Sequence, residues 1–260
     1  MKAPAAPRLD AALFDANYGA MSFLDRFRKK PANQLLEPGD HSLRQNLVNL
    51  ILGILTDKDG RIHAEDAISA AATVVGERCI DAAGDFALRD HEFTPGSRVF
   101  STKVNKLICG DVAEGGVNRI PKDSIVGMLR SRLDARVYTD ADFPALSDLF
   151  KYYAAYVGTA ADWGKVPLSV GEAHLPFIPP LRVGYETRVR VDEILHSIRD
   201  DKPRCLRIAT ESLAEILTMV ASAIDHKVAL TLAIETINGM SKTASMTIKA
   251  MQPDRAGSSA

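Results

Sequence analysis

The chain has 260 residues, 46% of them hydrophobic, enough for one large or two small folded domains with an apolar core. Its 32 Lys and Arg residues nearly balance 33 Asp and Glu residues, which excludes a global charge field favouring nucleic acid or an anionic membrane. The cysteines, an odd number at wide spacing, exclude a disulfide framework and a Cys-x-x-Cys motif.

The sequence shows no signal for export or membrane insertion. Its N-terminal residues lack the apolar stretch of a signal peptide, and no run of roughly 18 apolar residues predicts a membrane span. The few cysteines fit a reducing compartment. We therefore expect a soluble, cytoplasmic protein.

Helices are predicted throughout residues 1–157. Apolar residues from Leu9 to Phe27 recur at loosely helical spacing and predict a first helix. The clearest pattern covers residues 42–84, where two apolar stripes of helical period flank the turn Asp57-Lys58-Asp59-Gly60, and the second stripe stops at Gly84. This pattern predicts a helical hairpin. Shorter helices are expected after Ser101, around Ile125 and over residues 146–157.

Residues 158–184 form a Gly/Pro-rich connection that is too long for an ordinary loop. Because this connection contains Trp163 and the run Leu175-Pro176-Phe177-Ile178, we expect it to pack on the surface rather than to be a solvated linker. It is the best candidate for a domain boundary, although a single domain overall is also compatible with the pattern.

C-terminal helices are predicted over residues 185–252. Apolar and polar residues alternate over 182–191, as in a half-buried strand, but the same segment can begin a helix that continues to Ile198, and the helical neighbours favour the helix. Apolar stripes of helical period follow Pro203 and Asp225-His226-Lys227. The predicted fold class is mainly α: an irregular multi-helix bundle built from helical hairpins, with little or no β-strand.

The hairpin turn is similar to the centre of an EF-hand loop. Gly60 takes the turn position, while Asp57 and Asp59 take two early ligand positions. However, Leu55 stands at the first ligand position and Asp66 at the last, where a bidentate Glu is usual. The sequence therefore predicts weak calcium binding at best, with Asp57, Asp59 and Asp66 as the candidate metal ligands.

The wider pattern Asp59-Gly60-x-Ile62-x-x-Glu65-Asp66 also resembles turns in bacterial TerB-like helical domains, which are associated with tellurite resistance and metal-linked stress. That resemblance is confined to these residues. A simpler interpretation is structural: Asp and Gly make the turn, and Glu65 and Asp66 suit the positive end of the second helix.

Other motifs are isolated. Glu193 and His196 have the Glu-x-x-His spacing of di-iron bundles, but a second copy is missing, so we do not assign them a metal. No catalytic or nucleotide-binding signature is present. A modest basic concentration is interrupted by acids and gives no strong nucleic-acid signal. Its members are Arg119, Lys122, Arg130, Arg132 and Arg136.

Three function classes remain open. We favour a non-enzymatic helical interaction or regulatory protein, with a homodimer or other homo-oligomer formed through the apolar C-terminal helices. The first alternative is a metal-binding protein or metal-dependent enzyme that uses the Asp57 turn or the pair Glu193 and His196. The second alternative is a small-ligand binder in which residues 158–184 cover an aromatic-lined cavity beneath Trp163.

Overall fold

The computed structural model describes residues 39–85, 98, 100–111, 120–157 and 166–243, and the backbone of residues 8–10. The α-helices in this part of the chain are α2 (Asp40–Leu55), α3 (Ala64–Ala83), α4 (Thr102–Cys109), α5 (Ile125–Arg132), α6 (Leu146–Tyr156), α7 (Pro180–Ile194), α8 (Lys202–Val220) and α9 (His226–Met240). The described residues also form two short strands, β1 (Arg8–Asp10) and β2 (Arg61–His63). They include two 3₁₀ turns, η4 (Glu172–His174) and η5 (His196–Ile198). The predicted mainly α fold class is confirmed.

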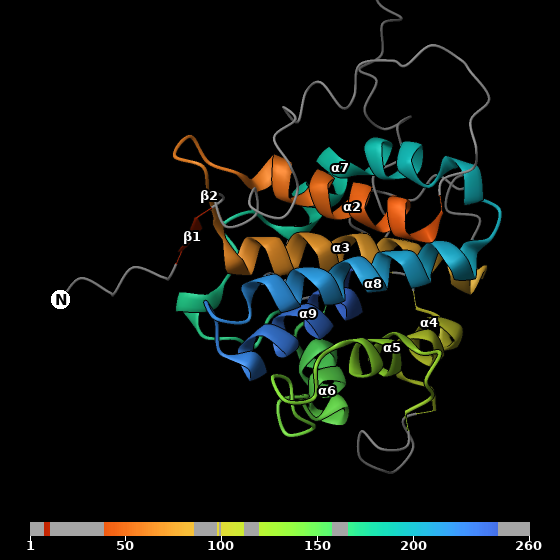
Figure 1. The fold of residues 1–260 in the computed structure, drawn as a ribbon. Helices are drawn as coiled ribbons and strands as arrows, with labels where there is room; N and C mark the ends of the chain where they lie inside the picture. The colour runs from red at the N-terminus through yellow and green to blue at the C-terminus, as the bar shows by residue number, and fades with distance from the viewer. Residues whose placement is uncertain are drawn as a thin grey trace, which may run out of the picture.

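Helix α3 lies at the centre of the bundle (Figure 1). Helices α2 and α7 pack on one side of it, and α8 and α9 pack on the other, with α4, α5 and α6 beyond them. Nearly every residue of α3 is buried, including alanines that allow neighbouring helices to approach closely. One continuous apolar cluster runs from α2 through α3 to α9.

The predicted hairpin is confirmed as α2, β2 and α3. The Asp57 carboxylate accepts hydrogen bonds from the backbone N–H groups of Asp59 and Arg61, at 2.8 and 2.9 Å, which closes the turn. Gly60 and Gly84 have φ angles of 76° and 64°, which favour glycine. Gly84 ends α3 as the apolar stripe predicts.

The helix expected to begin at Leu9 is wrong at its first residues. Residues Arg8–Asp10 form β1, which pairs antiparallel with β2 and places Leu9 opposite Ile62. A partner strand 50 residues away leaves no local periodicity, so the spacing alone could not reveal it. The remainder of that expected helix lies outside the described residues.

Residues 182–191 are helical, as the sequence favoured. Helix α7 begins at Pro180, where the fixed φ of proline suits a first turn, so it starts inside the predicted Gly/Pro-rich connection. Residues 166–179 pack on the bundle: Val166 is buried, and the N–H of Ser169 donates to the buried Glu235 carboxylate at 2.7 Å. Trp163 lies outside the described residues.

Helices α8 and α9 bury their apolar faces in the core of the bundle. Asp201 and Asp225 cap their first turns, and the apolar stripes predicted for both helices are buried within the chain. The residues that motivated a homodimer through these helices therefore already have intramolecular partners. Among the helices that the structure describes, none combines the length and apolarity needed to cross a membrane.

The crossing of α3 and α9 gives a stability prediction. A Cβ atom added at Gly76 would lie 2.6 Å from Met240 Cβ and 3.0 Å from the Ser241 backbone nitrogen. Gly76→Ala is therefore expected to lower the free energy of unfolding by about 1–3 kcal/mol. The same change at Gly53, exposed on α2, should raise it by about 0.5–1 kcal/mol through helix propensity. Urea unfolding of both variants checks this, and a Gly76→Ala protein as stable as Gly53→Ala would contradict the close crossing.

Candidate functional site

The three predicted metal ligands do not share one environment. Asp57 and Asp59 lie in the exposed turn, where both carboxylates pair with Arg61. Asp66 lies in the first turn of α3, is buried, and accepts a hydrogen bond from the Ile178 N–H at 3.0 Å. In the described part of the chain, no group of three or more His, Cys, Asp and Glu side chains is arranged to hold a metal ion.

Four titratable side chains from two distant segments meet at the start of α3. His63 Nε2 lies 3.2 Å from Glu65 Oε2, and His63 Nδ1 lies 3.4 Å from Asp66 Oδ2. His174, on η4, places Nδ1 2.9 Å from Glu65 Oε1. We call His63, Glu65, Asp66 and His174 the histidine–carboxylate cluster. Glu65 is fully buried, and His63 and Asp66 are nearly so.

This cluster joins η4 and the residues after it to the start of α3. The exposed Phe177 ring lies 4.4 Å from the His63 ring, between centroids, and the adjacent Ile178 is tied to Asp66. The cluster thus fastens residues 174–178, and with them the start of α7, onto α3.

Glu193 and His196 do not share a helical face. Helix α7 ends at Ile194, so Glu193 lies on the helix and His196 in the following η5 turn. His196 lines a small cleft of about 90 Å³ together with the buried Arg78. Burial opposes the charge of Arg78, but Asp81, Glu77 and Asp192 outweigh it and raise the pKa of the guanidinium.

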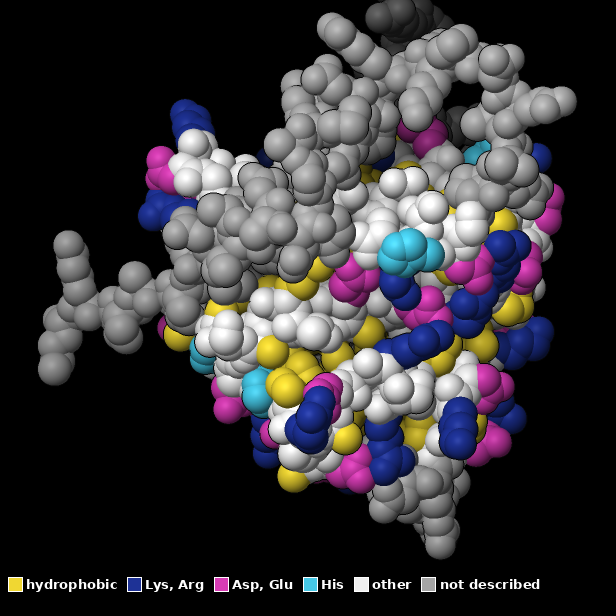
Figure 2. Space-filling view, viewed as in Figure 1, with side chains coloured by type: hydrophobic (Ala, Val, Ile, Leu, Met, Phe, Trp, Pro, Cys, Tyr) yellow, Lys and Arg dark blue, Asp and Glu magenta, His cyan; other side chains and the backbone are white. Residues whose placement is uncertain are grey.

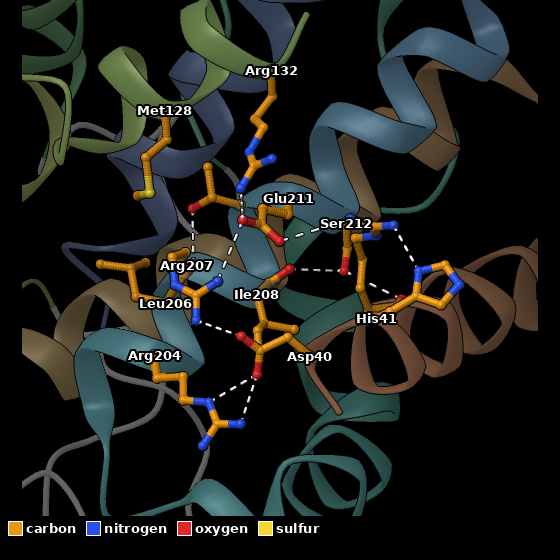
Figure 3. Close-up of polar contacts among 12 residues, drawn as sticks. Asp40, His41, Met128, Arg132, Arg204, Leu206, Arg207, Ile208, Glu211 and Ser212 are labelled. Atoms are coloured by element: carbon orange, nitrogen blue, oxygen red, sulfur yellow. Dashed lines mark hydrogen bonds and ion pairs between the residues drawn. The ribbon is translucent and has the colours of Figure 1, made fainter. Parts of the chain in front are cut away.

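A polar network joins α2, α5 and α8 (Figure 3). Asp40 lies between Arg204 and Arg207, with its oxygens 2.7 and 2.6 Å from their Nη2 atoms. Hydrogen bonds from Arg207 and Arg204 lower the pKa of the Asp40 carboxyl. Glu211 in turn pairs with Arg132 at 2.5 Å. The network therefore ties three helices together with charges of both signs.

Three arginines of the basic concentration noted in the sequence form ion pairs with acidic residues. Besides the Arg132 pair, Arg130 bonds Asp140 and Arg136 bonds Asp134, both at 2.7 Å. On the face shown in Figure 2, basic and acidic side chains are interspersed, and the part not drawn in grey shows no large area of a single sign.

A groove of about 440 Å³ lies between the end of α3, α4 and the start of α5. This volume is in the range of small-ligand sites. Two lysines line the groove, and both are paired: Lys103 with Asp85 at 2.5 Å and Lys106 with Asp111 at 3.2 Å. Its described lining residues include none from 158–184, so the groove does not test the predicted cavity beneath Trp163, a residue outside the described part of the chain.

Lys242 is a buried cation at the end of α9. Its Nζ bonds the Asn238 side-chain oxygen and lies 4.7 and 5.2 Å from the ring centroids of Phe150 and Tyr153. Burial lowers the pKa of Lys242 to about 8, although Cys109 and Cys79 oppose this shift. No sequence pattern marks this residue, because the two aromatic rings around it come from α6.

Helix α7 has one anchored face and one solvent face. On the anchored side, Arg188 pairs with Glu77, and Asp192 Oδ1 lies 2.9 Å from Arg78 Nη1. On the other side lie Tyr185, 45% exposed, and Val189, 49% exposed, one helical turn apart. We call the exposed side chains of this helix the α7 outer face. They are Arg182, Tyr185, Glu186, Val189, Arg190 and Glu193.

The chain matches no family model, no curated protein and no solved structure.

Proposed function

We propose that this protein acts without catalysis, as a helical interaction or regulatory protein that presents the α7 outer face to another protein. The observation that carries this proposal is the exposure of Tyr185 and Val189 side by side on a well-anchored helix. An aromatic and an aliphatic side chain surrounded by charged groups match the usual anatomy of a protein interface, with an apolar centre and a polar rim.

The anchoring of α7 supports a preformed docking surface. Its first residues follow the segment fastened by the histidine–carboxylate cluster, and its middle is fixed by the buried pair of Arg188 and Glu77. A helix held in this way loses little conformational freedom on binding, which favours affinity. We also propose a cytoplasmic location, supported by the buried free thiols of Cys79, Cys109 and Cys205.

Site-specific photo-crosslinking tests the proposal. We expect a benzophenone amino acid at position 185 of the full chain to form a light-dependent adduct with another polypeptide in an extract of the source organism. The matched control is the same probe at Val137, which is also exposed but lies in a turn away from α7. If position 185 gives no more adduct than position 137, the proposed function is wrong.

A further inference from the structure

We infer that the partner of the α7 outer face is a second copy of this chain, bound through an antiparallel pair of α7 helices related by a two-fold axis. The inference rests on the proposed function and names the partner of the same surface. It follows from the order of side chains along the helix.

The exposed apolar side chains of α7 match each other under two-fold symmetry. A two-fold axis perpendicular to α7 places each residue opposite the one equally far from the axis on the other side. With the axis at the level of Thr187, Tyr185 lies opposite the partner's Val189, and Val189 lies opposite the partner's Tyr185. Both exposed apolar side chains of the α7 outer face are then covered at once.

Opposite charges match about an axis within one residue of this level. The pair Glu186 and Arg190 is centred on Arg188, and the pair Arg182 and Glu193 is centred between Thr187 and Arg188. With the axis between Thr187 and Arg188, Arg182 lies level with the partner's Glu193. Glu186 and the partner's Arg190, like Tyr185 and the partner's Val189, are then offset by one residue, about 1.5 Å along the helix. The two-fold axis repeats each contact, so opposite charges face each other at every charged position of the α7 outer face.

Other occupants fit the charge order of this face less well. Two arginines and two glutamates give this face no net charge, so a uniformly acidic or basic partner would meet like charges at half of these positions. Arg182 and Glu186 already pair within the helix at 2.8 Å, while Arg190 and Glu193 have no ion pair within the part of the chain that the structure describes. A second copy supplies partners of the required sign for both.

Light scattering of the full chain over a range of concentrations tests the apolar contact. We expect the wild type to reach a dimer of twice 28.2 kDa, Tyr185→Glu to stay monomeric, and the matched control Val137→Glu to dimerise as the wild type does. Circular dichroism checks that the variants remain folded. A dimer that Tyr185→Glu leaves intact would use another surface and would overturn the inference.

A charge swap tests the register. Glu186→Arg alone places like charges opposite each other at two symmetry-related contacts, so we expect dimer affinity to fall by about tenfold or more. Adding Arg190→Glu restores opposite signs at both contacts and should restore the affinity. A double variant as weak as the single variant would overturn the antiparallel register.

The two proposals fail separately. If the wild type is monomeric at every concentration while the probe at position 185 captures a different polypeptide, the self-pairing is wrong and the proposed function stands. If the wild type is monomeric and the probe captures nothing above its control, both are wrong. An adduct of two copies of this chain supports both.

Discussion

Replacing Glu77 with alanine is expected to lower the free energy of unfolding by about 3–5 kcal/mol, the usual cost of breaking a buried ion pair by removing one partner. The Glu77 carboxylate, on α3, accepts a hydrogen bond from the Arg188 guanidinium, on α7, and its side chain is 4% exposed. The Arg188 side chain is only 14% exposed, so water cannot readily replace the lost carboxylate. The variant should also weaken the packing of α7, and with it the α7 outer face, on α3.

Urea unfolding followed by circular dichroism measures this loss. The control is Asp148→Ala, which removes the exposed pair of Asp148 and Lys151 and should move the unfolding midpoint little. The double change Glu77→Leu with Arg188→Met should recover most of the stability, because apolar side chains replace both charges. Equal losses in Glu77→Ala and Asp148→Ala would mean that the Glu77–Arg188 pair does not hold α7.

The hairpin of α2 and α3 could be predicted because its signals are local. Apolar stripes of helical period define the helices, the Asp57 side chain closes the turn on its own backbone, and Gly84 has the φ that a helix end requires. Ser101 likewise caps α4, where its hydroxyl accepts from the N–H groups of Lys103 and Val104. Each signal lies within a few residues of the structure that it sets.

The surroundings of Glu65 could not be predicted from the same signals. The sequence placed Glu65 correctly in the first turn of α3, but its contact with His174 joins residues 109 positions apart. The pair of Glu77 and Arg188 spans 111 positions. Such contacts depend on how helices pack, and a single sequence has no period or spacing that records them.

Helix α7 shows why short patterns can be ambiguous. Alternation over residues 182–191 fits a strand, yet on a helix Val183 and Val191 point into the bundle while Val189 points outward. The packing of α7 on α3 decides between the two, and it also creates the α7 outer face. The order of charged residues along this segment can be read from the sequence. Only a helix, however, brings these residues together on one exposed face.

Lys242 is expected to give the stability of the protein an unusual dependence on pH. Its pKa is about 8 in the folded chain, compared with 10.5 for an ordinary lysine. Between these values the unfolded chain holds the proton and the folded chain does not, so stability should rise with pH across this window, by at most about 1.4 kcal/mol per pH unit. Below about pH 8 both states are protonated, and this contribution is flat.

Buried thiols act in the opposite direction at higher pH. Burial raises the pKa of Cys79 to about 12 and that of Cys109 to about 11, from 9.0, so the unfolded chain loses these protons first and stability falls above about pH 9. We therefore expect the difference between wild type and Lys242→Met, measured by urea unfolding in reducing buffer, to shift in favour of the wild type between about pH 7.5 and about pH 9. The methionine keeps the length of the side chain and removes its charge. If the difference is the same at both pH values, Lys242 does not titrate in this window, and its cation is better solvated than its 5% exposure implies.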